Sequence, residues 1–206
     1  MFLQGDHYQM NATKFSQSPE TEINRVKDLI RRSLDGSFFN IDIDGSTLVD
    51  LDKPTIDEQQ KNNYEMTALM TQYIRSIQPD DGTVSVGGEI GHIGGKNSTV
   101  EDFEAFMQGY LSNLHDSKIS GISKVALQTG TSHGGIPMPD GTLADVSIDF
   151  DAIKTIGDVA RSTYGLGGPV QHGASTLPEE FFHKFPASKT LEIHLATEFQ
   201  NIVYAH

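Results

Sequence analysis

Three histidines in this chain each follow a short strand-like segment, and their chemistry is that of metal ligands. His7 closes the segment FLQGDH, His133 follows VALQTGTS, and His172 closes GPVQH. Three neutral imidazoles leave one position open on a tetrahedral Zn²⁺, which is the composition of a catalytic site. The chain has no cysteine, so a transition metal must take His, Asp or Glu ligands. We therefore predict a site for Zn²⁺ or another divalent metal at His7, His133 and His172.

Three carboxylates occupy similar positions near strand ends. Asp6 directly precedes His7, and a carboxylate beside a metal ion can donate or accept a proton. Asp44 and Glu89 end the segments FFNIDID and TVSVGGE. We predict that Asp6 is catalytic, and that Asp44 and Glu89 are further metal ligands or hydrogen-bond partners of the histidines. A salt bridge at the same edge of the sheet is the alternative interpretation of Asp44 and Glu89.

Glycine-rich turns follow two of the histidines. Gly134 comes directly after His133, and Gly173 and Ser175 come shortly after His172. Backbone N–H groups and hydroxyls in such turns bind anions, and the loops after the last two strands of a β/α barrel commonly hold a phosphate. We predict a phosphate-bearing substrate, bound by Gly134, Gly173, Ser175 and Thr197.

Strand-like and helical patterns alternate along the whole chain. The predicted strands are Phe2–His7, Phe38–Asp44, Thr83–Ile90, Ile122–Thr129, Pro169–His172 and Leu191–Ala196. Helix starts are indicated by Ser18 with Pro19, and by two capping boxes, Thr55 with Glu58 and Ser98 with Glu101. This alternation predicts βαβ units and a parallel sheet with right-handed crossovers.

Two architectures fit that alternation, an open doubly wound sheet and a TIM (β/α)8 barrel. Polar residues end at least five strands, and only in a barrel do all strand ends face one mouth, so the barrel is favoured. About six of the eight β/α units are present, and the chain begins and stops within structured-looking sequence. We therefore expect an incomplete chain in which residues 1–206 form a single partial TIM-barrel domain.

Composition narrows the function further. The chain has 206 residues, of which 36% are hydrophobic, and a formal net charge of −13. Nucleic acid and anionic membrane surfaces both favour Lys and Arg, so neither is expected as a partner. The sequence has no apolar run of about 20 residues and no signal peptide, which predicts a cytoplasmic protein.

In order and spacing, these segments resemble the class II, metal-dependent fructose-bisphosphate aldolases. The resemblance is carried by QGDH (Gln4–His7), NIDIDGS (Asn40–Ser46), GGEIGHIGG (Gly87–Gly95), QTGTSHGG (Gln128–Gly135), QHGAST (Gln171–Thr176) and EIHLATE (Glu192–Glu198). It covers essentially the whole chain, as the last six of eight β/α units. Because several motifs match the family in both order and spacing, the resemblance is more specific than a match to any single motif would be.

The resemblance implies a function and a set of roles. The reaction is reversible aldol cleavage of a ketose (bis)phosphate, with zinc stabilising the enediolate of dihydroxyacetone phosphate. His7, His133 and His172 are the implied zinc ligands, and Asp6 is the implied acid/base residue. Asp44 and Glu89 match carboxylates that support the metal or hold it in an alternative position. Substrate contacts are implied for Gly134, Gly173, Ser175 and Thr197, to which we add His194, in the place of the family's asparagine. A homodimer is also expected.

The chain departs from the family where the proton-abstracting base normally lies. Lys96 and Asn97 follow the glycine pair of the mobile loop, where the family has acidic residues. Two alternatives to a lyase therefore remain open. One is a non-catalytic, aldolase-like accessory subunit, and the other is a metal-dependent sugar-phosphate epimerase or isomerase.

Overall fold

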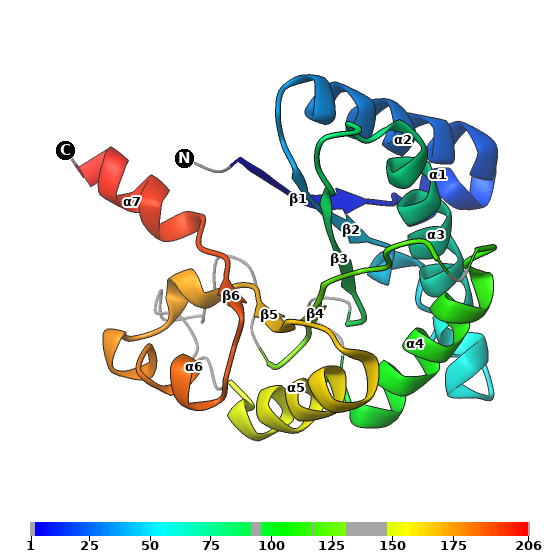
Figure 1. The fold of residues 1–206 in the computed structure, drawn as a ribbon. Helices are drawn as coiled ribbons and strands as arrows, with labels where there is room; N and C mark the ends of the chain where they lie inside the picture. The colour runs from blue at the N-terminus through cyan, green and yellow to red at the C-terminus, as the bar shows by residue number, and fades with distance from the viewer. Residues whose placement is uncertain (1–2, 92–95, 117, 131–147, 206) are drawn as a thin grey trace. The chain divides into compact units, whose positions relative to one another are not determined.

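The computed structural model describes residues 3–91, 96–116, 118–130 and 148–205, and the chain divides into two compact units. The first comprises Met1–Ile90 with Glu101–Ser123, and the second Gly91–Val100 with Lys124–His206. In each unit, parallel strands alternate with helices (Figure 1). The six parallel strands of the described residues confirm the predicted α/β class. Closure into a TIM barrel and a single domain over residues 1–206 stay predictions.

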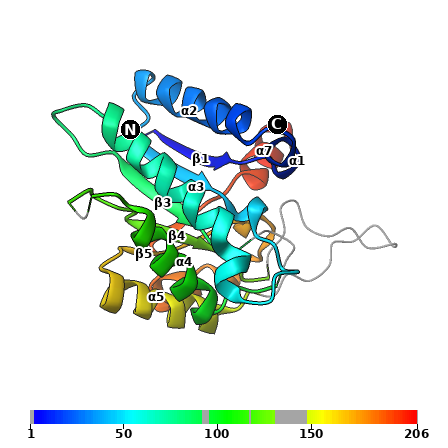
Figure 2. The same ribbon diagram turned by 90° about the vertical axis from the view of Figure 1, so that its right-hand side faces the viewer.

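The first unit is built on three strands with β2 in the middle. Its elements are β1 (Gln4–Gln9), α1 (Ala12–Gln17), α2 (Pro19–Asp35), β2 (Asn40–Asp44), the 3₁₀ turn η1 (Ser46–Leu48), α3 (Ile56–Ile77), β3 (Ser85–Glu89) and α4 (Val100–Asn113). Helices α2 and α3 run alongside the strands (Figure 2). Side chains from both layers are fully buried between them: Val26, Ile30, Ile41, Ile43, Met70, Ile74 and Val86. This core holds the carboxyl ends of β2 and β3 in place.

Strand β1 contains a bulge at Asp6 and His7. Gly5 pairs with Ile41, but the next pair is Tyr8 with Ile43, so β1 has one residue more than its partner over this stretch. His7 has a φ of 53°, in the left-handed region that non-glycine residues rarely adopt. The strand continues to Gln9, so the prediction that it ends at His7 was wrong. The bulge, rather than a strand end, determines the direction of the His7 side chain.

The second unit is built on β4, β5 and β6, with β5 in the middle. Its elements are β4 (Lys124–Leu127), α5 (Phe150–Tyr164), β5 (Gly168–Gln171), the 3₁₀ turns η2 (Ala174–Thr176) and η3 (Glu179–Phe181), α6 (Lys184–Ala187), β6 (Glu192–Ile193) and α7 (Thr197–Ala205). A small apolar core joins α5 to the segment after β5, and it consists of Ile148, Ile153, Ala174, Leu177 and Phe185. This core packs beneath the turn that follows His172.

The predicted helix starts agree with the structure to different degrees. The capping box of Thr55 and Glu58 is present at the start of α3. Ser18 is the N-cap of α2 and Pro19 opens that helix, but the Ser18 side chain makes no capping hydrogen bond. Ser98 differs from the prediction, because α4 begins only at Val100 and Ser98 bonds instead to the backbone of Gln128. Among the described residues, no helix is long and apolar enough to cross a membrane.

Candidate metal and substrate site

In the first unit, the structure brings together a histidine and two carboxylates that the sequence singled out. His7 Nδ1 lies 3.2 Å from Asp44 Oδ2 and 3.7 Å from Glu89 Oε2. Potential ligand atoms of the three side chains all lie within 4.8 Å of one another. Asp44 and Glu89 are buried, whereas the His7 side chain is 27% exposed. Imidazole and carboxylate donors at this spacing fit a divalent metal such as Zn²⁺.

Hydrogen bonds hold Asp44 in its ionised form. Burial by itself would raise the pKa of Asp44, but hydrogen bonds from His7, Ser46 and Gln9 outweigh it and lower the pKa below its usual value. The Ser46 hydroxyl donates to Oδ1 at 2.6 Å, and the Gln9 amide donates to Oδ2 at 2.5 Å. Because metal ligands must be deprotonated, this environment prepares Asp44 as a ligand or as a partner of one.

Two residues that were not predicted from the sequence fix the position of Glu89. Asn63 in α3 donates from Nδ2 to the Glu89 carbonyl at 2.8 Å, and Gln60 donates to the next carbonyl, Ile90 O, at 3.2 Å. Both side chains are buried. Their signal in the sequence is a polar row at helical spacing, which continues with Thr67 and Thr71 on the face that packs against the strands.

Asp6 lies beside this cluster on the bulge of β1. Its Oδ1 accepts a hydrogen bond from the backbone N–H of His7 at 2.9 Å, and its Oδ2 is 3.6 Å from His7 Nε2. The Asp6 side chain is 30% exposed, so solvent and small molecules can reach it. This position agrees with the predicted acid/base role, which stays a prediction.

In the second unit, His172 and His194 lie directly after β5 and β6 and contact each other. His172 Nε2 is 2.9 Å from His194 Nδ1, and the ring centroids are 4.7 Å apart. On its other side, His194 Nε2 is 3.1 Å from Glu192 Oε2. Glu192 Oε2 also accepts a hydrogen bond of 2.6 Å from Lys124 Nζ. Lys124 and Glu192 were not predicted, although a lysine opening the buried strand KVAL requires a partner.

Two of the predicted phosphate-binding segments, at Gly173–Ser175 and at Thr197, lie next to each other in this unit. Gly173 has a φ of 70° and leads into η2, a conformation that suits glycine. The Ser175 hydroxyl accepts a hydrogen bond of 3.0 Å from the backbone N–H of Ala196, immediately before Thr197 opens α7. Gly173, Ser175 and the backbone of Thr197 are thus connected, while their contact with substrate stays a prediction.

His133 and Gly134 lie outside the described residues, as does the loop segment 92–95. The predicted meeting of His7 with His133 and His172 around one metal therefore stays a prediction. The two described clusters belong to different units: His7, Asp44 and Glu89 to the first, and His172 and His194 to the second.

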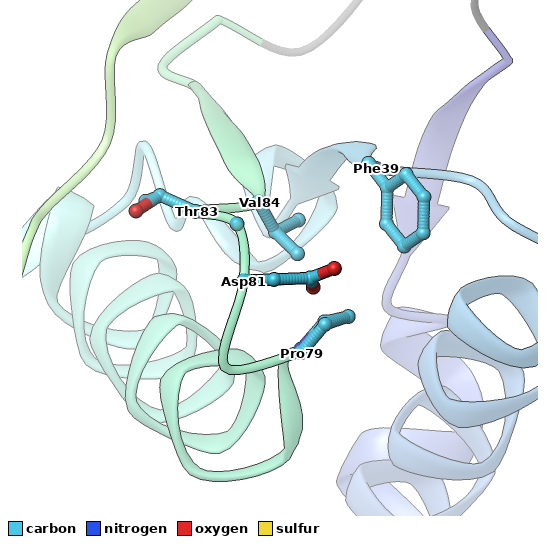
Figure 3. A pocket seen from close by; sticks show the side chains of 6 residues that line it. Phe39, Pro79, Asp81, Thr83 and Val84 are labelled. Carbon is cyan, nitrogen blue, oxygen red and sulfur yellow. The ribbon is translucent and has the colours of Figure 1, made fainter.

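A pocket in the first unit lies away from this chemistry. It has a volume of about 300 Å³ and is lined by Phe39, Pro79, Asp81, Gly82, Thr83 and Val84. Phe39 directly precedes β2 and Val84 directly precedes β3, so the pocket is at the amino ends of these strands. Figure 3 shows the Asp81 carboxylate directed into it between apolar walls. Asp44 and Glu89 stand at the opposite, carboxyl ends of the same strands.

Parallel βα units with histidine and carboxylate side chains near the carboxyl ends of the strands define a class of α/β proteins to which several enzyme families belong. Comparison with known families identifies the particular one. The chain belongs to the class-II fructose-bisphosphate aldolase family, which it matches over residues 2–206. The resemblance inferred from the sequence is thereby confirmed. No curated protein sequence matches the chain.

Solved structures agree on the fold. The chain is similar to a fructose-bisphosphate aldolase from Campylobacter jejuni, with 16% identity and a TM-score of 0.57 over 95% of this chain and 51% of that chain. It is also similar to the YdjI aldolase from Escherichia coli K12, with 13% identity and a TM-score of 0.56 over 86% of this chain and 51% of that chain. The chain therefore spans about half the length of these structures.

Proposed function

We propose that this chain is the metal-binding part of a lyase that catalyses reversible aldol cleavage of a ketose (bis)phosphate. The observation that carries the proposal is the cluster of His7, Asp44 and Glu89, whose ligand atoms lie within 4.8 Å of one another. A bound divalent ion, zinc in the first instance, would supply positive charge that polarises the ketose carbonyl and stabilises the dihydroxyacetone phosphate enediolate.

The side chains of the protein would divide the remaining work. His7, Asp44 and Glu89 would hold the ion together with His133 and His172. Asp6 would give and take a proton at the aldehyde or carbinol oxygen, for which its exposed position beside His7 is suited. The connected turns at Gly173 and Ser175, with Gly134 and Thr197, would bind the phosphate. The cytoplasmic location and the homodimer belong to the same proposal.

The accessory-subunit alternative is favoured by one specific observation. Lys96 and Asn97 stand where an acidic base is expected, and the next residue, Ser98, is attached to the end of β4. Ser98 N donates to Gln128 O at 2.7 Å, and Ser98 Oγ accepts from Gln128 N at 3.0 Å. These two bonds restrain the segment that follows the glycine pair.

One set of assays on the full chain distinguishes these functions. Metal content, cleavage of ketose bisphosphates and exchange of dihydroxyacetone-phosphate protons with solvent are measured in parallel. Metal with cleavage supports the lyase, exchange without cleavage supports an epimerase or isomerase, and metal with neither activity supports an accessory subunit. A chain that binds no divalent metal contradicts the proposal.

Substitution of Asp44 tests the metal cluster itself. Asp44→Asn replaces the charged carboxylate next to His7 with a neutral amide and is expected to weaken Zn²⁺ binding by about 10-fold or more. Asp28→Asn, on the exposed face of α2, is the matched control and should leave the affinity unchanged. Equal Zn²⁺ affinities for the two variants would show that the metal does not use this cluster.

A further inference from the structure

The pocket at the amino ends of β2 and β3 combines apolar walls with one carboxylate. Its volume of about 300 Å³ is in the range of sites that bind small organic ligands. Phe39, Pro79 and Val84 provide the apolar surface, and Asp81 is the one ionisable side chain among its described lining residues. In Figure 3 the Asp81 carboxylate points into the space beside the Phe39 ring. The pocket therefore suits a ligand that is largely apolar and carries one positive charge.

Hydrogen bonds hold the walls of this pocket in place. Val84 N donates to Gln78 Oε1 at 3.2 Å, which closes the loop between α3 and β3 into an arch. Arg75 Nη1 donates to Gln78 Oε1 at 2.9 Å and to Val84 O at 2.6 Å, so both ends of the arch are tied to α3. On the opposite wall, Phe39 O accepts from Ser85 N at 2.9 Å. A ligand would therefore enter a formed site and would not have to order it.

The charge of Asp81 is available to a ligand. Among the residues that the structure describes, no cationic side chain lies within ion-pair distance of Asp81, and none donates a hydrogen bond to it. Arg75 lines an adjoining hollow, but its guanidinium donates to the backbone carbonyls of Val84, Ser120 and Gly121. Apolar walls lower the local dielectric, so a carboxylate between them attracts a cation more strongly than one in open water does.

The Phe39 ring adds a second attraction for the same charge. Phe39 is 44% exposed, so a ligand in the pocket can contact its ring. The face of an aromatic ring attracts a cation that lies within about 6 Å of its centre. A neutral ligand of the same shape would cover the Asp81 carboxylate without replacing the hydrogen bonds that water makes to it. An anion would be repelled by it.

We propose that this pocket binds a small organic ammonium ion. The charged group lies between the Asp81 carboxylate and the Phe39 ring, and the apolar body of the ligand packs against Pro79 and Val84. The candidate metal cluster stands at the opposite, carboxyl ends of the same strands. The ammonium site is therefore separate from that cluster and does not depend on the proposed lyase function.

Titration of the ¹⁵N-labelled full chain with benzylamine, followed by NMR at neutral pH, tests the site. Benzylamine is a cation under these conditions, and benzyl alcohol is a neutral compound of similar shape. We expect benzylamine to shift the amide signals of Gly82 and Val84 in a saturable way, and benzyl alcohol to bind about 3- to 10-fold more weakly. Equal affinities for the two compounds, or no shift at these two amides, would overturn the proposal.

Two neighbouring carboxylates give a matched pair of variants. Asp81 lines the pocket, whereas Asp80 is an exposed residue of the same loop that lines only the adjoining hollow. Asp81→Asn is expected to weaken benzylamine binding by about 3- to 10-fold. Asp80→Asn removes the same charge and should change the affinity by less than about 2-fold at an ionic strength of about 0.15 M, where separated surface charges are screened. Equal losses would show attraction to general negative charge and contradict the proposal.

Phe39→Leu tests the aromatic wall. Leucine keeps an apolar surface but has no ring face, so benzylamine should bind about 2- to 5-fold more weakly while benzyl alcohol changes less. Equal changes for both compounds would show that the ring contributes only apolar contact, against the proposed position of the charge. Signals of Gly82 and Val84 that move with protein concentration in the absence of benzylamine would show that a second copy of the chain fills the pocket, which would also overturn the proposal.

The outcomes also separate the ammonium site from the proposed lyase activity. A protein that binds benzylamine at Asp81 and Phe39, yet cleaves no ketose phosphate, refutes the lyase and leaves the site intact. A protein that cleaves the substrate but shows no saturable shift with benzylamine refutes the site and leaves the lyase intact.

Discussion

A single residue, His7, determines how the cluster of His7, Asp44 and Glu89 forms. Its backbone is left-handed, with a φ of 53°, at a bulge where β1 has one residue more than β2. At this bulge, the side chains of Asp6 and His7 need not point to opposite faces of the sheet as they would in a regular strand. The ring of His7 then reaches Asp44 at the end of β2, the neighbouring strand, and Glu89 at the end of β3, one strand further along the sheet. A regular strand would place Asp6 and His7 on opposite faces, and only one of them could lie near these carboxylates.

At the same scale, the ion pair of Glu22 and Arg25 links stability to pH. Glu22 is buried and accepts hydrogen bonds from Arg25 and from the backbone N–H of Asn11. The Arg25 hydrogen bond lowers the pKa of Glu22, against the opposing effect of burial. Its stabilising contribution is therefore fully present above the unfolded-state pKa of about 4.3, and it is lost as the pH falls through the lower pKa of the folded protein.

We therefore expect Glu22→Gln to reduce the free energy of unfolding by about 1–3 kcal/mol at pH 7, because Arg25 loses its charged partner. The difference from the parent protein should shrink below pH 4. Urea unfolding at several pH values measures it, with Glu20→Gln, exposed in the first turn of the same helix, as the control. A difference that stays constant down to the acid limit would show that Glu22 is not the titrating group.

Several of the polar residues in the candidate site could be predicted from the sequence, but the contacts between residues could not. The sequence identified His7, Asp44 and Glu89 because each polar side chain ends or interrupts an apolar segment. It did not identify Lys124 and Glu192, because their pairing is a cross-strand contact between residues 68 positions apart. Sequence patterns report which face a residue occupies, whereas pairing depends on register, which only the folded sheet determines.

At the scale of elements, two hydroxyl residues before helices look equivalent in sequence and differ in structure. The Thr55 hydroxyl accepts from the backbone N–H of Glu58, and the Glu58 carboxylate accepts from Thr55. The Ser18 hydroxyl contacts the Thr21 hydroxyl at 2.8 Å and caps nothing. Pro19 has no N–H to satisfy at the first helical position of α2, so part of the need for a cap is absent there.

Alanine substitutions test this difference. Thr55→Ala should lower the free energy of unfolding by about 1 kcal/mol, whereas Ser18→Ala should cost less than about half of that. Both are measured by denaturant unfolding under identical conditions. Comparable losses at the two positions would indicate that Ser18 also contributes a cap, contrary to the hydrogen bonds observed.

The packing of α3 against the end of β2 leaves no room for a side chain at Gly45. A Cβ there would lie 2.5 Å from Asn63 Oδ1 and 3.1 Å from Asn63 O. Asn63 holds the carbonyl of Glu89, so the displacement would reach the candidate metal ligand. We expect Gly45→Ala to destabilise the protein by about 1–3 kcal/mol and to weaken Zn²⁺ binding.

Gly82 provides the matched control for that substitution, because a Cβ there meets nothing within 4 Å. Gly82→Ala should leave both stability and Zn²⁺ affinity close to those of the parent, or slightly raise stability by restricting the unfolded chain. Thermal unfolding and Zn²⁺ titration of the two variants give the comparison. An equally mild effect at Gly45 would mean that α3 adjusts without disturbing Glu89.

At the scale of the whole molecule, the alternation of strands and helices in the sequence was enough to predict six parallel strands, and the order and spacing of the motifs predicted the family. Alternation alone does not determine whether the strands close into a barrel, because closure depends on tilt and shear along the whole sheet. The chain also spans about half the length of the solved aldolases it resembles. Whether residues 1–206 form a single domain is therefore tested by asking if the two units unfold cooperatively, rather than from the pattern of the sequence.

Phe185 offers that test, because it lies in the core of the second unit and contacts Phe150 and Phe182 there. Phe185→Ala should destabilise this core by about 3–5 kcal/mol through lost burial and the cavity left behind. If residues 1–206 fold as one domain, hydrogen exchange in β2 of the first unit must accelerate together with exchange in β5 of the second, since both then report the same global unfolding. Mass spectrometry of peptides covering the two strands, in low denaturant, measures this. Acceleration confined to β5 would show that the two units unfold independently, and the prediction of a single domain over residues 1–206 would then be wrong.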